Sequence, residues 1–158
     1  SWESCQIQFR RSANYMSLNT EHLARCILTL ETSLSLLRQS EAGSIDYEIY
    51  RNAVVKSFEL SLETAGKLLR KAIKAYTGTP RYVDGLTYKD VLRHGVKHGL
   101  LNTNAVERWF TYRDNRNSTA HDYGVAFAEE TLALLPAFIA DANSLKAILQ
   151  EKFGHGNA

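Results

Sequence analysis

Hydrophobic residues recur along the first half of the chain with the spacing of α-helices. Leucine and isoleucine lie three or four positions apart in residues 23–37, which makes one face of a helix over residues 20–39 apolar. The same spacing in residues 55–76 predicts a longer helix that begins after Ser44, a residue type that caps helix starts. We expect buried stripes of Leu23, Ile27, Leu30, Leu34 and Leu37, and of Val55, Phe58, Leu62, Ala65, Leu69, Ala72 and Tyr76.

Three further helices are expected in the second half of the chain. Residues 81–86 are expected to form a loop, and residues 87–99 to form a short helix, because this segment starts with a Thr-x-x-Asp capping pattern and ends in glycine. We expect the fourth helix over residues 102–123. Residues 126–152 predict the fifth, which Pro136 should kink. The buried stripe of this last helix is expected to comprise Phe127, Leu134, Phe138, Leu145 and Leu149.

The predicted elements define an all-α fold. No stretch alternates hydrophobic and polar residues as a half-buried strand does, and the sequence has no glycine-rich phosphate loop and no Gly-x-Ser-x-Gly motif. Four long helices and one short helix with short connections predict an antiparallel up-and-down four-helix bundle with one extra short helix. We expect residues 18–153 to form this bundle as one domain, between an N-terminal extension (1–17) and a tail (154–158).

Composition adds an expectation about the compartment. The chain is 44% hydrophobic with 9 glycines and 2 prolines, which is ordinary for a globular domain rich in long helices. Cys5 and Cys26 form no recognisable disulfide framework, which favours a reducing compartment. No hydrophobic run approaches the roughly 20 residues of a membrane span, and no secretory signal pattern is present. We therefore expect a cytoplasmic protein that does not enter a membrane.

The charge is unevenly distributed along the chain. The net charge of +2 is too small to indicate nucleic-acid binding by itself. Residues 67–98, however, contain eight Lys and Arg against two Asp, so this segment is locally +6 and the remainder of the chain is −4. The simpler interpretation, which we favour, is the solvated face of two helices. Such a concentration of positive charge would also attract phosphate groups.

The densest polar stretch of the sequence is residues 113–123, at the end of the fourth predicted helix. A solvated helix end with weak surface ion pairs is the simplest interpretation. A guanidinium, an imidazole and a phenol within two helical turns favour a functional site instead. Two neighbouring stripes of the helix each begin with an aromatic residue and then turn polar: Trp109, Arg113, Arg116, Ala120 and Tyr123, and Phe110, Asp114, Asn117 and His121.

Two other groups of polar residues are candidates for chemistry. Glu59 and Glu63 lie one turn apart in the second helix, where we favour ion pairs with lysines at helical spacing over a role of Glu63 in orienting a base. His94 and His98 are also one turn apart, a spacing that can hold a metal. No third ligand accompanies them at a recognisable spacing. Positive charge at a helix end explains them more simply, so we expect no metal site.

The polar stretch contains Arg116-x4-His121-x-Tyr123, which resembles the Arg-x4-His-x-Tyr signature of HEPN-domain proteins of the HepT kind. The chain is more similar to the nucleotidyltransferase substrate-binding branch, small helical proteins paired with a minimal nucleotidyltransferase. One departure is Gly66, where this family is expected to have tryptophan. The resemblance covers residues 23–149 and rests on Phe58-Glu59 with Glu63 and Lys67, Gly99-Leu100-Leu101, Trp109-Phe110, and Arg116-Asn117-x-Thr119-x-His121-x-Tyr123.

Arg116 and His121 diverge by roughly 140° on one regular helix, so something must bring them together on a substrate. The helix can break at Ala120, or a two-fold dimer can place two copies of the fourth helix side by side. The resemblance implies the homodimer, because HEPN domains commonly dimerise through this face. Its expected apolar contacts are Trp109, Phe110 and Tyr112.

The resemblance also implies roles for the residues of the motif. His121 would take the proton from an RNA 2′-hydroxyl group while Arg116 holds the phosphate, which is RNA cleavage without a metal or cofactor. By resemblance, Tyr123 is the residue to which the partner nucleotidyltransferase transfers AMP and so silences the ribonuclease. The remaining expected roles are an additional phosphate contact for Arg113, orientation of the site by Asn117 and Thr119, and support from Glu63 and Asp114.

Two functions therefore fit the sequence. The first is a ribonuclease toxin that is controlled by AMP transfer to Tyr123, and the complete set of Arg116, His121 and Tyr123 favours it. The second is a non-catalytic subunit that presents substrate or nucleotide to the nucleotidyltransferase. The closer similarity to the substrate-binding branch and the modest positive charge favour this second function. A purely structural helical dimer would leave the polar face of the fourth helix unexplained.

Overall fold

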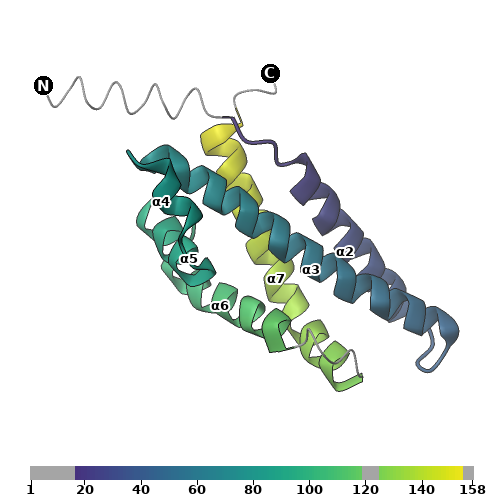
Figure 1. Ribbon diagram of the computed structural model, residues 1–158. Helices are drawn as coiled ribbons and strands as arrows, with labels where there is room; N and C mark the ends of the chain where they lie inside the picture. The colour runs from purple at the N-terminus through teal and green to yellow at the C-terminus, as the bar shows by residue number, and fades with distance from the viewer. Residues whose placement is uncertain (1–16, 119–124, 155–158) are drawn as a thin grey trace, which may run out of the picture.

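The structure is a computed structural model that describes residues 17–118 and 125–154. Within these ranges every regular element is helical, which confirms the predicted all-α fold (Figure 1). The elements are α2 (Glu21–Gln39), α3 (Ile45–Ile73), the 3-10 turn η1 (Lys74–Tyr76), α4 (Pro80–Asp84), α5 (Tyr88–Lys97), α6 (Thr103–Ser118) and α7 (Val125–Phe153).

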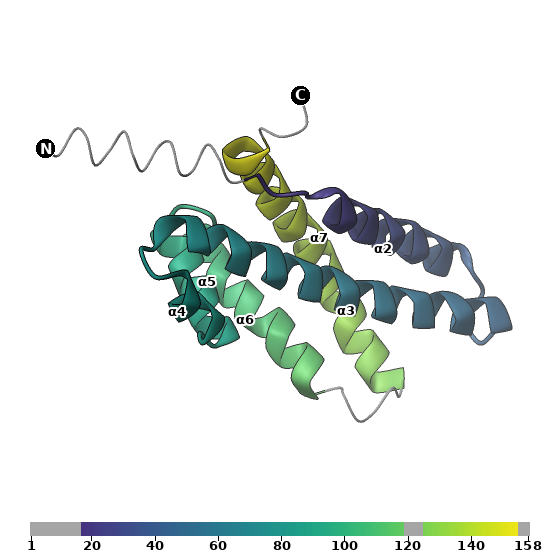
Figure 2. The same ribbon diagram turned by 45° about the horizontal axis from the view of Figure 1, so that its top comes forward.

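Helix α3 is the centre of the arrangement. Helix α2 packs along it on one side, and α5 and α6 lie on the other side, which both views show (Figures 1 and 2). Helix α7 contacts α2, α3 and α6 and so closes the bundle. Helix α5 packs against both α3 and α6. Helix α5, which belongs to the basic segment, and the described part of the polar motif on α6 therefore lie on the same side of α3.

The core follows the predicted stripes of α2 and α3. All five expected residues of α2 are at most 5% exposed, and those of α3 from Val55 to Ala72 are at most 8% exposed. Aromatic residues join the helices at the centre of the bundle. The ring of Phe138 on α7 meets Phe58 of α3 edge-on at 4.8 Å between centroids, and Tyr112 of α6 at 5.1 Å. Such edge-to-face pairs stabilise a core beyond the burial of their area.

The predicted helix ends are largely confirmed. The Ser44 hydroxyl accepts a hydrogen bond from the backbone N–H of Tyr47 at 3.1 Å, and the Thr87 hydroxyl accepts one from Asp90 at 3.2 Å. These side chains satisfy donors that the first turn of a helix leaves without partners. Gly99, with φ of +73°, adopts the left-handed conformation expected after the end of α5.

The expectation of a loop over residues 81–86 is wrong for most of that segment, because α4 covers it from Pro80. Proline is favoured in the first turn of a helix, since its missing N–H has no partner there in any case. The guanidinium of Arg70 stabilises this corner by donating to the carbonyl oxygens of Val83 at 2.7 Å and Leu86 at 3.0 Å. Val83 is only 1% exposed, so one apolar residue anchors α4 in the core.

Helix α7 differs from its prediction in two ways. Leu135 is fully buried where Leu134 was expected, and Leu134 is only partly buried. The chain from Ala128 to Phe153 is also long and apolar enough to cross a membrane by length and composition, so the expectation that no apolar run approaches this length is wrong. Core residues such as Phe138 and Leu149, both 0% exposed, account for part of this apolar character.

A hydrogen-bonded network that the sequence did not reveal ties α6 to α7. The guanidinium of Arg108 donates two bonds of 2.8 Å to the carboxylate of Asp141, and the Tyr112 hydroxyl donates a third of 2.6 Å. Asp141 is 8% exposed. Burial by itself would raise the pKa of this carboxyl group, but the bonds from Arg108 and Tyr112 and the arginine charge outweigh it and lower the pKa.

Replacing Asp141 with asparagine is expected to lower the free energy of unfolding by about 1–3 kcal/mol at neutral pH, because charge-assisted bonds at a buried group are lost. The lowered pKa of Asp141 means that its stabilisation is fully present above the ordinary carboxyl pKa of about 3.9 and is lost as the pH falls through the folded-state value. Urea unfolding of both proteins should therefore show a difference that shrinks below about pH 4.

Asp84→Asn is the matched control for this experiment. Asp84 forms an ion pair of 2.6 Å with Lys74, but its side chain is 59% exposed. Exposed pairs contribute about 0–1 kcal/mol, so this variant should stay close to the wild type. Equal losses of stability in the two variants would contradict a special role of the Asp141 network.

Candidate functional site

The last turns of α6 carry the first half of the polar motif. Arg113, Asn115 and Arg116 are half-buried there, and Asp114 is exposed. Thr119, His121 and Tyr123 lie outside the described residues, as does the side chain of Asn117. The structure therefore shows the surroundings of Arg113 and Arg116. The catalytic and AMP-accepting roles expected for the motif stay predictions.

The guanidinium of Arg113 lies over the ring of Tyr88, the first residue of α5, at 4.8 Å from the ring centroid. Such a stack holds a planar cation in a fixed orientation and leaves its N–H groups able to bind an anion. The Tyr88 hydroxyl is buried and has no hydrogen-bond partner among the described residues. Burial is the main cause that raises the pKa of this phenol, and the nearby charges of Arg113 and Arg116 oppose it.

Tyr88 also explains the glycine at position 66. A Cβ atom on Gly66 of α3 would lie 2.8 Å from Cε2 of Tyr88, which is closer than real contacts allow. The tyrosine ring of α5 therefore occupies the space beside α3 in which a tryptophan was expected. The departure from the family pattern is accounted for by a residue on the neighbouring helix, and this residue supports Arg113.

Glu63 lies where α3 faces the end of α6. Its carboxylate pairs with Lys67 at 3.2 Å, and Glu59 is 4.0 Å from Lys56, so the expected ion pairs at helical spacing are confirmed. The pKa of Glu63 is lowered, first by the hydrogen bond and charge of Lys67 and to a smaller extent by the charge of Arg116. The positive charge of Arg116 on α6 thus acts on a carboxylate of α3. A supporting role for Glu63 stays a prediction.

Asn115 connects the motif to the following helix. The hydroxyl of Thr131 on α7, which is 0% exposed, donates to Oδ1 of Asn115 at 3.2 Å. Because a buried hydroxyl without a partner is costly, this bond holds the end of α6 against the start of α7. This contact could not be predicted from the sequence, since neither residue belongs to the signature and they are 16 positions apart.

The dimer prediction required Trp109, Phe110 and Tyr112 to lie at the surface, and two of them do not. Trp109 and Tyr112 are each 1% exposed and belong to the core of one copy. Phe110 is partly buried beneath two cations, with Lys89 at 5.4 Å and Arg93 at 5.5 Å from its ring centroid. Trp109 and Tyr112 therefore do not supply the apolar contact surface that was expected of them, and the contact predicted for Phe110 stays a prediction.

His94 and His98 belong to an aromatic column at the other end of α5. The His98 ring stacks on Tyr76 at 4.5 Å between centroids and lies parallel to His94 at 6.3 Å. Burial and the neighbouring cations lower the pKa of His98. Among residues 17–118 and 125–154, no three His, Cys, Asp or Glu side chains are grouped closely enough to hold a metal ion.

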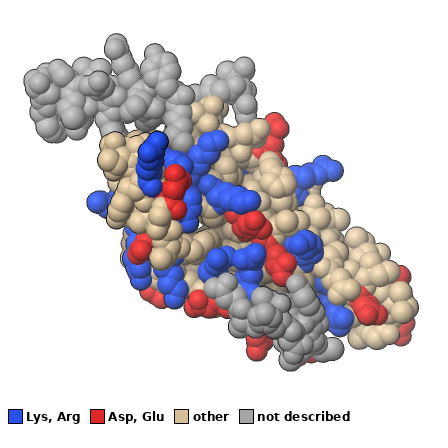
Figure 3. Space-filling view, viewed as in Figure 1, with Lys and Arg blue, Asp and Glu red and all other residues tan. Residues whose placement is uncertain are grey.

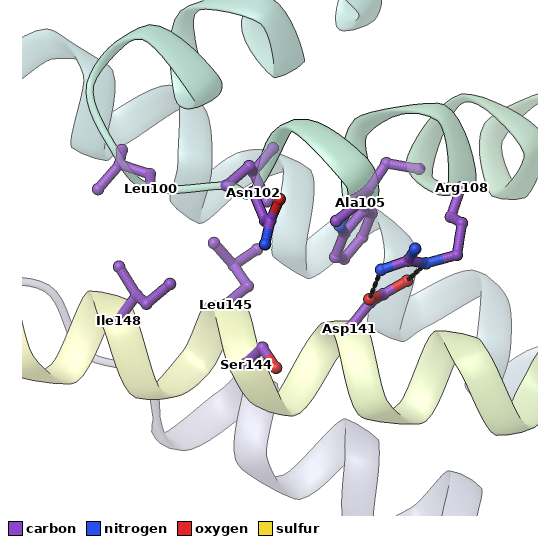
Figure 4. A pocket seen from close by; sticks show the side chains of 10 residues that line it. Leu100, Asn102, Ala105, Arg108, Asp141, Ser144, Leu145 and Ile148 are labelled. Carbon is purple, nitrogen blue, oxygen red and sulfur yellow. Dashed lines mark hydrogen bonds and ion pairs between the residues drawn. The ribbon is translucent and has the colours of Figure 1, made fainter.

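A cavity of about 290 Å³ lies between the start of α6 and α7, away from the motif (Figure 4). The Arg108–Asp141 ion pair forms one of its walls, and Leu100 and Ile148 lie toward its other end. None of the residues that the sequence singled out for chemistry lines it. The two guanidinium groups of Arg113 and Arg116, one helical turn apart, are the better candidates for binding a phosphate.

Comparison with known proteins gives consistent results. Residues 18–151 match the family model described as nucleotidyltransferase substrate binding protein like. A relative from Haemophilus influenzae, named as a probable ribonuclease HepT, is 24% identical over 98 residues. That alignment covers 62% of this chain and 66% of the relative, which is just under two thirds of its length.

A solved structure from Haemophilus influenzae has a similar fold. It is described as the fold of a substrate-binding domain of a nucleotidyltransferase, and it superposes with a TM-score of 0.73 at 21% sequence identity. The match covers 84% of this chain and 99% of the other. At this level of identity the likeness establishes the helical fold of the chain.

Replacing Gly66 with leucine is expected to lower the free energy of unfolding by about 1–3 kcal/mol, because the new side chain must displace the Tyr88 ring. The gain in helix propensity over glycine, about 1 kcal/mol, offsets only part of this cost. In a Tyr88→Ala background the same substitution should be neutral or stabilising. Urea unfolding of the four proteins measures the coupling, and an equal cost in both backgrounds would contradict it.

Proposed function

Since the chain belongs to the nucleotidyltransferase substrate-binding protein-like family, we propose that it is the HEPN subunit of a two-protein system with a minimal nucleotidyltransferase. In this proposal it acts in the cytoplasm as a metal-independent ribonuclease toxin. The observation that carries the proposal is the guanidinium group of Arg113, which lies over the Tyr88 ring one helical turn before Arg116, in the helix that precedes His121 and Tyr123 in the chain. The name of its Haemophilus relative, probable ribonuclease HepT, supports it.

The proposed reaction needs only a base, an acid and a phosphate clamp. A neutral His121 takes the proton of a ribose 2′-hydroxyl group, whose oxygen attacks the adjacent phosphorus. The bond from phosphorus to the 5′-oxygen breaks, and a protonated histidine returns a proton to that oxygen. The products are a 2′,3′-cyclic phosphate and a 5′-hydroxyl end. Arg116 and Arg113 stabilise the negative charge that builds on the phosphate.

We propose a homodimer that uses the outer face of α7. Only 33% of the most apolar stretch of this helix is buried within one copy. Ala133, Pro136, Ala137 and Ala140 are exposed in its first half, where small side chains allow a second helix to approach closely. Because the start of α7 is bonded to the end of α6 through Thr131 and Asn115, a two-fold axis near this face would bring the two copies of the α6 end closer together.

The alternative function is a non-catalytic subunit that presents a substrate or nucleotide to the nucleotidyltransferase. The specific observation in its favour is the solved relative, whose fold is described as a substrate-binding domain and which is matched over 99% of its length. In this alternative the arginine pair would bind the phosphates of the presented molecule without cleaving it.

The wild-type chain, expressed without a partner, is expected to cleave RNA and to slow cell growth, whereas His121→Ala should leave RNA intact. Removing a general base typically costs about 10²–10⁴-fold in rate. Arg116→Ala should lose activity to a similar degree, because the phosphate clamp is lost. Denaturing gel electrophoresis of a labelled RNA measures the cleavage and also identifies a cyclic-phosphate end.

Two comparisons make this experiment decisive. Arg38→Ala, an exposed arginine near the end of α2, should cleave at the wild-type rate. Mixing the inactive Arg116→Ala and His121→Ala proteins should restore part of the activity if two copies share one cleft. Intact RNA with the wild-type protein would overturn the ribonuclease and leave the alternative function.

Tyr123 is expected to be the only tyrosine that accepts AMP when the chain is incubated with its nucleotidyltransferase, ATP and Mg²⁺. Mass spectrometry should find the mass of one AMP added to the wild type and none added to Tyr123→Phe. The modified protein should no longer cleave RNA, because a bulky anion would occupy the phosphate site. An AMP group on Tyr82, a tyrosine that is 59% exposed, would contradict the assignment.

A further inference from the structure

Helix α5 presents a row of cations toward solvent. Lys89, Arg93 and Lys97 recur every four residues, so they lie along one side of the helix, and all three are exposed. From Lys89 to Lys97 the row covers eight steps along the chain, which correspond to about 12 Å along the helix axis. Lys and Arg side chains lie over α5 and α6 on the face seen in Figure 3, with acidic side chains between them.

The row is continuous with the arginines of the motif. Lys89 and Arg93 both lie over the ring of Phe110 on α6, and this residue is one turn before Arg113 on the same helix. Arg113 in turn lies over Tyr88 at the start of α5. Aromatic rings on both helices thus hold cations from the neighbouring helix in place. The cations form one surface that leads from the motif along α5.

The acidic partners on this surface do not cancel its attraction for phosphates. Arg93 pairs with Asp90 at 2.8 Å and Lys89 with Asp114 at 3.8 Å, and these carboxylates are 44% and 61% exposed. Ion pairs with this exposure contribute little to stability, so a phosphate can take the place of the carboxylate at small cost. The segment that contains the row is locally +6, whereas the rest of the chain is −4.

We propose that Lys89, Arg93 and Lys97, the α5 row, bind successive phosphates of an RNA strand that has one linkage at Arg116. The row spans about 12 Å along the helix axis in addition to the arginines of the motif, so a strand with several phosphates can contact all of its members at once. The inference rests on the proposed function for the identity of the strand as RNA. It adds a binding surface that the Arg-x4-His-x-Tyr signature does not contain.

The test measures the binding of a labelled single-stranded RNA of twelve nucleotides by fluorescence anisotropy at several salt concentrations. All proteins carry His121→Ala, so that the RNA stays intact. Lys89→Gln with Arg93→Gln is expected to weaken binding at least fivefold. It should also make the slope of log K against log[salt] less steep by about 1.4, since each phosphate contact on a single strand contributes about 0.7.

Arg25→Gln with Arg38→Gln is the matched control, because it removes two exposed positive charges from α2, which contacts α3 and α7. It should change the affinity less than twofold and leave the salt slope unchanged. Equal effects of the two double variants, or no effect of either, would overturn the α5 row. Thermal unfolding of each variant checks that the fold is kept.

The same proteins without the His121 substitution separate the two proposals. If the wild type leaves RNA intact but the α5 variant still loses affinity, the row stands and the ribonuclease fails. If the wild type cleaves RNA and both double variants bind it equally well, the ribonuclease stands and the row fails. A wild-type protein that binds no RNA would overturn the row.

Discussion

The position of α6 depends on one cluster of interactions at the centre of the bundle. Phe138 of α7 forms edge-to-face pairs with Phe58, Trp109 and Tyr112, with ring centroids 4.8–5.8 Å apart, and so joins α3, α6 and α7. The Tyr112 hydroxyl leaves this apolar cluster to bind Asp141, which Arg108 also holds. Since the polar motif begins directly after Tyr112, the orientation of Arg113 and Arg116 follows from a helix fixed from within the core.

The cations around the motif have a common mode of support. Arg113 lies over Tyr88, and Lys89 and Arg93 lie over Phe110, so each positive charge rests on an aromatic face contributed by the other helix of the α5–α6 pair. A ring fixes the direction of a side chain without using its hydrogen-bond donors. Long flexible side chains thereby lose less freedom when they bind an anion, which favours binding to phosphates.

The sequence predicted most of the fold because its leucine spacing is regular. The stripes of α2 and α3 lie in the core as expected, and Ser44, Thr87 and Gly99 mark helix ends. The failures concern contacts between helices that are far apart in the sequence. Spacing on α6 could not show that Trp109 and Tyr112 turn inward, because the partner Asp141 lies 29 residues after Tyr112. Likewise, the need for glycine at position 66 depends on the ring of Tyr88, which lies on another helix and would clash with a Cβ atom there.

Arg70 holds the corner between α3 and α4 with a side chain that always carries a positive charge. One terminal nitrogen of this residue binds two carbonyl oxygens, and α5 begins only two residues after the second of them, Leu86. A guanidinium group remains protonated across the whole physiological range. A histidine in this place would lose its positive charge near neutral pH and keep a single N–H donor, whereas arginine keeps both carbonyls bonded. The turn that leads into α5 is thus held by a positive charge that does not depend on the acidity of its surroundings.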